Sequence, residues 1–232
     1  MKKSFNIIIL SSLLLCSFIN IFAQEKMVSE QEITNLRNNA YEKLKNKTYR
    51  VIMTSEGYVN AKDSSPNQFV KGITEYISPD RLHSIYERKT GETTFREEAI
   101  SIGQKKYVKQ DNENWKELLP LGNSAGNATG IGSGSGFKTA IIDNEKTVEY
   151  KYKGKETIKN QKADLYVVTT MRKYNSPNFK STTVITEKFW LDKDGVFLKR
   201  ESETKLNYKK VINHILWEYE YDPNIKIEAP IK

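Results

Sequence analysis

The chain has 232 residues, with 37 Lys and Arg against 29 Asp and Glu, and a formal charge of +8 at pH 7. Its single cysteine excludes an internal disulfide and any metal site built on several thiolates. Basic residues are interspersed with acidic ones along the chain instead of clustering on one element, a pattern that argues against a nucleic-acid partner.

Residues 1–23 predict a secretory signal peptide. Lys2 and Lys3 give a positive start, an apolar run follows, and Ala23 supplies the small residue at which a signal peptidase cuts. Serines interrupt the run, which is shorter than the roughly 20 apolar residues that span a bilayer. We therefore expect a periplasmic protein cleaved after Ala23, with secretion as an alternative. Residues 24–232 then form one domain with a charge lowered from +8 to +6 and no transmembrane segment.

Cys16 raises a second possibility, a lipid-anchored protein acylated on this thiol. Such a site needs a small residue just before the cysteine, and Leu15 stands there. Cleavage after Ala23 would remove Cys16 altogether, so lipid anchoring is the alternative to a free periplasmic domain.

One helix is predicted at the start of the mature chain, over residues 28–47. Ser29 is a candidate N-cap, with Glu32 three residues later as in a capping box. A stripe of apolar residues then recurs at three- and four-residue steps: Ile33, Leu36, Ala40, Tyr41 and Leu44. We expect this stripe to pack on the domain's own core, with binding to a partner or a membrane surface as the alternative.

The remainder of the chain predicts about 11 strands. They are rich in β-branched and aromatic residues and are separated by turn residues. The expected strands are Tyr49–Thr54, Phe69–Ser78, Arg81–Lys89, Phe95–Ile102, Lys105–Lys109, Trp115–Leu118, Thr147–Lys153, Ala163–Tyr174, Thr182–Asp192, Phe197–Leu206 and Lys210–Tyr221. Their short connections indicate hairpins, hence a meandering antiparallel sheet.

Two of these strands carry apolar residues on both faces. In 211–221, one face would hold Val211, Ile215, Trp217, Tyr219 and Tyr221, and the other Ile212, His214 and Leu216. In 182–192, Val184 and Trp190 would share one face, with Ile185, Phe189 and Leu191 on the other. Something must cover part of the second face, either a helix or a ligand.

The segment 122–136 differs from the rest in composition. It holds six of the twelve glycines and is otherwise mostly Asn, Ser, Ala and Thr, which indicates a flexible loop. A long loop inside a compact domain is often a lid or a binding loop. Residues 137–143 could form a short helix against the sheet.

No catalytic, cofactor or metal site is predicted. The glycine string 130–136 lacks the strand–loop–helix setting and the terminal Gly-Lys-Ser/Thr of a phosphate-binding loop. His83 and His214 are the only histidines, and neither stands in a ligand cluster with the spacing that zinc requires. A Ser-His-Asp hydrolase is not excluded by composition.

Aromatic side chains are the remaining candidates for a binding function. Ordinary sheet packing explains most of them. For the minority that would line an apolar ligand cavity, the first candidates are Trp190 and Trp217, together with Phe189 and Ile215.

Short motifs recur between the predicted strands over residues 49–230: Ser78-Pro79-Asp80-Arg81, Ile100-Ser101-Ile102-Gly103, Phe189-Trp190-Leu191-Asp192 and Tyr219-Glu220-Tyr221-Asp222-Pro223. With these motifs, the order of elements resembles the LolA/LolB-like superfamily of periplasmic lipoprotein-carrier and lipid-binding proteins, whose fold the sigma-regulatory protein RseB shares.

This resemblance implies an α+β fold: an N-terminal helix and a strongly curved antiparallel sheet that forms an unclosed barrel. An apolar cavity on its concave side would be lidded by a mid-chain segment. The function implied is a non-enzymatic carrier or binding protein for a lipid, an acyl chain or a lipoprotein, and we expect a monomer. Alternatives are an RseB-like sensor or interaction domain that binds another envelope protein, and an exported hydrolase.

Overall fold

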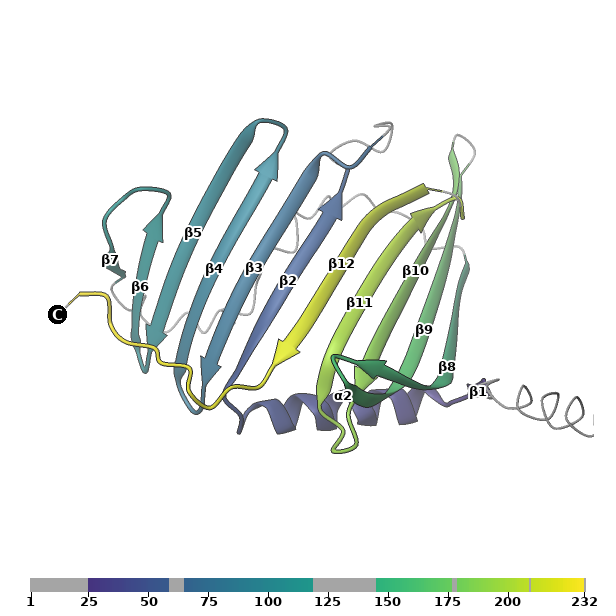
Figure 1. Ribbon diagram of the computed structural model, residues 1–232. Coiled ribbons are helices and arrows are strands. Elements are labelled where there is room, and N and C mark those ends of the chain that lie inside the picture. Colours follow the sequence, from purple (N-terminus) through teal and green to yellow (C-terminus); the bar gives the residue numbers. More distant parts are fainter. Residues whose placement is uncertain (1–24, 59–64, 119–144, 177–178, 209, 232) are drawn as a thin grey trace, which may run out of the picture.

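A computed structural model describes residues 25–58, 65–118, 145–176, 179–208 and 210–231. Within these ranges, twelve antiparallel strands form one sheet with a single helix against it (Figure 1). The spatial strand order is β1-β8-β9-β10-β11-β12-β2-β3-β4-β5-β6-β7, so the sheet is open between β1 and β7. The predicted signal peptide, the loop 122–136 and the helix 137–143 lie outside the described residues.

The sheet confirms the antiparallel, unclosed architecture predicted from the sequence, and the fold is mostly β. Every predicted strand is present. The elements are β1 Lys26–Met27, α2 Glu30–Leu44, β2 Tyr49–Gly57, β3 Gln68–Ile77, β4 Arg81–Thr90, β5 Thr93–Ile102, β6 Lys105–Gln110, β7 Lys116–Leu118, β8 Glu145–Ile158, β9 Gln161–Ser176, β10 Phe179–Leu191, β11 Phe197–Leu206 and β12 Lys210–Glu220. The twelfth strand, β1, pairs with β8 and is too short for alternation to reveal it.

Helix α2 begins at the predicted cap and is shorter than predicted at its end. The Ser29 hydroxyl accepts a hydrogen bond from the backbone N–H of Glu32 at 3.1 Å, which satisfies one of the free donors of the first turn. The apolar stripe buries Ile33, Ala40 and Leu44 against the sheet. The helix therefore packs on the domain's own core, as expected.

The face of the sheet that α2 covers is called here the helix-side face. Phe189 of β10 lies on it. The strand register places Tyr166 of β9, Arg200 of β11 and Trp217 of β12 on the same face. Arg37 of α2 lies over the Phe189 ring at 5.1 Å. Figure 1 shows the helix running along one end of the strands, so a large part of this face extends beyond it.

The opposite face, called the tail-side face, is covered at the same end by two other segments. The β8–β9 hairpin folds over it, because the register shifts by one residue between Tyr152 and Gly154. Its turn residue Lys159 forms ion pairs with Glu218 and Glu220 of β12. After β12 the chain crosses the sheet toward β6 (Figure 1), with Ile225 and Ile227 packed on Ile100 and Tyr107 and Trp115 at the cluster's margin.

Helix α2 and the β8–β9 hairpin cover the two apolar faces predicted for the strands 182–192 and 211–221. The helix packs on the Phe189 side, while the folded hairpin buries Trp190 and Leu198 on the other side.

The predicted alternation is wrong at Val211. A bulge shifts the register so that Asn213 lies opposite Thr204 but Val211 lies opposite Lys205, which places Val211 on the tail-side face, away from Ile215.

Candidate functional site

Part of the helix-side face carries no Asp, Glu, His, Lys or Arg and extends past the helix. The register aligns Trp217, Met53, Gly72 and Tyr86 across four neighbouring strands. Together with uncharged residues of the rows on either side, they form what we call the neutral surface: Trp217, Met53, Gly72, Tyr86, Ile215, Ser55, Val70, Val51, Thr74, Ser84 and Ala99. Charged residues border it on the same face, with Arg88 opposite Val70, Glu97 opposite Tyr86 and Arg200 opposite Trp217. None of these side chains of the neutral surface is an acidic or basic residue of the Asp, Glu, His, Lys or Arg type.

The neutral surface is packed at its centre and partly exposed around it. Met53 is 7% exposed, whereas Val70, Tyr86, Ile215 and Trp217 are half-buried. A Cβ built on Gly72 would lie 3.3 Å from the Met53 Cε, so the missing side chain leaves room for Met53. The core cluster that contains the α2 residues takes in Val51 and Trp217 at the margin of this surface, and no other residue of the neutral surface.

The four predicted cavity residues lie in different environments. Phe189 is 1% exposed and sits inside the core between α2 and the sheet. Trp190 is 4% exposed on the tail-side face, where its indole N–H donates to the Glu156 carboxylate at 2.8 Å. Trp217 and Ile215 both belong to the neutral surface. The structure therefore brings Trp217 and Ile215 together and places Phe189 in the adjoining core, but it turns Trp190 to the opposite side.

Behind the neutral surface, the same strands carry charges on the tail-side face. His83 of β4 lies between two carboxylates, with Nδ1 3.0 Å from Glu75 and Nε2 2.8 Å from Glu98. Arg50 donates to the other oxygen of Glu75 from its Nε at 2.9 Å. Burial by itself raises the pKa of Glu75, but the hydrogen bonds from His83 and Arg50 outweigh it, and the pKa is below its ordinary value.

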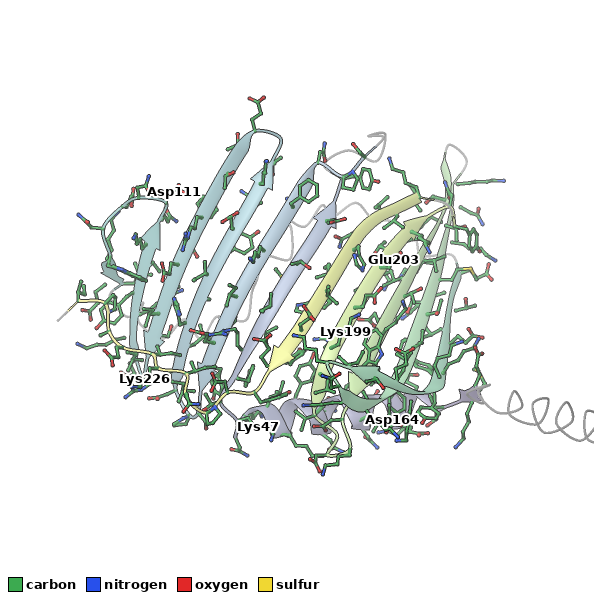
Figure 2. The ribbon with its side chains drawn as sticks, in the orientation of Figure 1. Lys47, Asp111, Asp164, Lys199, Glu203 and Lys226 are labelled. Atoms are coloured by element: carbon green, nitrogen blue, oxygen red, sulfur yellow. The ribbon has the colours of Figure 1, made fainter. Side chains whose placement is uncertain are left out.

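A similar arrangement surrounds the second histidine. His214 of β12 lies 3.3 Å from Glu201, which also pairs with Lys188. Lys199 and Glu203, labelled in Figure 2, lie along β11 on this same charged face. The tail-side face thus combines these ion pairs with an apolar row of Ile52, Ile73 and Ile85, whereas the neutral surface holds no ion pair.

The contacts of the two histidines bear on the hydrolase alternative. A Ser-His-Asp mechanism needs a serine hydroxyl beside the imidazole. Within the described ranges, the side chains hydrogen-bonded to His83 and His214 are carboxylates. The sequence does spell Gly-x-Ser-x-Gly once, at residues 122–126, a segment outside the described residues.

Shallow hollows occur elsewhere on the sheet, and their linings differ. One of about 360 Å³ on the tail-side face near the β5–β6 edge is polar, lined by Thr94, Arg96, Glu98, Lys109, Asp111 and Asn112. Another, of about 410 Å³, includes Met171, Val184 and Tyr208. Neither hollow includes a residue of the neutral surface. Of the part of the chain that the structure describes, no helix is long and apolar enough to cross a membrane.

Comparisons with known proteins find likenesses of structure only. No protein-family model and no curated protein matches the sequence. Among solved structures, LprF from Mycobacterium bovis aligns with a TM-score of 0.43 and 10% identity, over 88% of this chain and 99% of LprF. A DUF1329 family protein from Desulfovibrio piger aligns with a TM-score of 0.27 and 8% identity, over 84% and 94% of the two chains. Neither likeness assigns a ligand or an activity to this chain.

Proposed function

We propose that this chain is an exported, non-enzymatic binding or carrier protein for a lipid, an acyl chain or a lipoprotein of the cell envelope. The observation that carries the proposal is the neutral surface. Most of this uncharged and largely apolar surface lies outside the core that packs on α2, and exposed patches of this kind mark ligand or partner sites. The opposite face of the same strands carries the ion pairs of Arg50, Glu75 and His83, whereas the neutral surface carries none.

The physical basis of such binding is the burial of methylene groups. Each CH₂ removed from water contributes about 0.8 kcal/mol. A long acyl chain therefore supplies enough free energy for tight binding without any specific polar contact. Trp217, Ile215, Met53 and Val70 would contact it, since they lie side by side on neighbouring strands.

The predicted signal peptide supports an exported location. Its removal after Ala23 would deliver residues 24–232 to the periplasm. Amino-terminal sequencing of the protein isolated from the envelope tests this directly: we expect a mature chain that begins at Gln24. A chain that retains its leader, or a lipid-modified Cys16, would overturn the proposed free periplasmic form.

The test of binding combines native mass spectrometry with lipid extraction of the purified protein. Two variants at adjacent residues of β3 form a matched pair, because Val70 belongs to the neutral surface and Lys71 points to the opposite face. We expect bound lipid in the natural protein and in Lys71→Glu, and its loss in Val70→Glu. A protein free of lipid that pulls down a stoichiometric envelope protein would instead support the interaction-domain alternative.

A further inference from the structure

Arg172 lies on the helix-side face and forms no ion pair with a described residue. It lies on β9, with Lys146 of β8 and Thr183 of β10 directly opposite. Its Nε is buried and makes no hydrogen bond, and among the described residues it is the only buried side-chain nitrogen or oxygen in this state. No acidic side chain in the described ranges forms an ion pair with it. A buried polar group in this condition calls for an explanation.

The surroundings of Arg172 suit an anion. Lys146, on the neighbouring strand, adds a second positive charge, and it too has no ion pair with the described carboxylates. Thr170 precedes Arg172 by two residues and points to the same face, and Thr183 lies across from it. A guanidinium offers a planar set of donors that matches a carboxylate or a phosphate, and the threonine hydroxyls can add further hydrogen bonds.

The position of Arg172 connects this basic site to the neutral surface. Ile185 lies opposite Thr170 on β10, and Thr204 lies opposite Ile185 on β11. The next strand is β12, which carries Ile215. Neighbouring strands are about 4.8 Å apart, so about 14 Å separates β9 from β12. An extended acyl chain can cover this distance while its charged end stays at β9.

We propose that Arg172, assisted by Thr170 and Thr183, binds the anionic headgroup of an acyl ligand whose chain lies on the neutral surface. This inference rests on the proposed lipid-binding function and specifies its ligand class: a carboxylate or phosphate monoester attached to a long alkyl chain. The ligand would also give the guanidinium an acceptor, which no described side chain provides as an ion pair.

The test uses three probes with the same chain length: hexadecanoate, hexadecyl phosphate and hexadecan-1-ol. Titrations measure the affinity of each for the natural protein and for Arg172→Met. Arg96→Met is the control, because Arg96 lies on β5 on the opposite face of the sheet. We expect the natural protein to prefer the anions over the alcohol by roughly 10- to 100-fold, the range expected for hydrogen bonds to a charged group.

Arg172→Met should remove that preference and leave the affinity for hexadecan-1-ol within about twofold, whereas Arg96→Met should change neither. The stronger of the two anions then tells whether the site is built for a carboxylate or a phosphate. Equal affinity for anions and alcohol, or a preference that survives in Arg172→Met, would overturn the headgroup site while leaving the lipid carrier intact. If none of the three probes binds, the proposed function fails and the headgroup site with it.

Thermal unfolding of the ligand-free proteins gives a second readout. Because no described residue forms an ion pair with Arg172, Arg172→Met should unfold at the same temperature as the natural protein or at a higher one. A Tm lowered by several degrees would assign Arg172 a structural role and contradict the inference.

Discussion

The substitution Phe189→Ala distinguishes a packed core from a ligand cavity. Phe189 is 1% exposed. Its ring stacks on Tyr166 with centroids 5.2 Å apart, meets Phe197 edge-on at 6.3 Å, and lies under the Arg37 guanidinium. Removing a buried phenylalanine ring that is packed on all sides costs about 3–5 kcal/mol of unfolding free energy. Phe69→Ala is the control, because Phe69 is 42% exposed and its truncation should cost about 0.5 kcal/mol or less.

Urea denaturation followed by tryptophan fluorescence measures both variants. The slope for proteins of this kind is about 1–3 kcal/mol per molar urea, so Phe189→Ala should lower the midpoint by about 1 M or more. A loss no larger than that of Phe69→Ala would refute the reasoning. It would mean that the Phe189 side chain borders a space that a ligand fills, as the sequence alone suggested.

Three further perturbations follow from individual contacts. Ser29→Ala removes the N-cap of α2 and should cost about 1 kcal/mol in the same urea assay; an unchanged midpoint would show that the cap is dispensable. Trp190→Phe deletes the donor to Glu156 and should cost about 1–3 kcal/mol, whereas Trp115→Phe, for which no such bond is found among the described residues, should cost less. Glu75→Gln tests the lowered pKa: ionised Glu75 stabilises the fold at neutral pH, and this contribution is lost as the pH falls below the ordinary value of 4.5 and through the folded pKa. The variant should therefore be less stable than the natural protein at neutral pH and equal to it in acid, and a difference that persists in acid would contradict this.

Local sequence patterns were sufficient to predict the strands. Alternating apolar residues bounded by turn residues marked all eleven, and Ser29 with Glu32 marked the helix start. Strand lengths were harder to predict, because pairing extends wherever a neighbour offers free backbone groups. Thus β8 continues to Ile158 through a bulge after Tyr152, beyond the last residue of the predicted strand.

The candidate site was only partly predictable, because it depends on which strands become neighbours and on what lies above them. Alternation already placed Phe189 and Trp190 on opposite faces. It could not show that α2 would cover Phe189, or that the β8–β9 hairpin would fold over Trp190. Arg172 carried no signal at all in the sequence. An arginine is noticed as unpaired only when the positions of all surrounding carboxylates are known.

Photo-crosslinking tests most directly whether an acyl chain binds to the neutral surface. A hexadecanoate analogue with a diazirine in its chain would be bound, irradiated, and mapped on the protein by peptide mass spectrometry. We predict labels in residues 51–55, 70–74 and 213–217, on side chains of the helix-side face, with labelling reduced by Val70→Glu and not by Lys71→Glu. Labels confined to tail-side residues, or spread evenly over the surface, would contradict it.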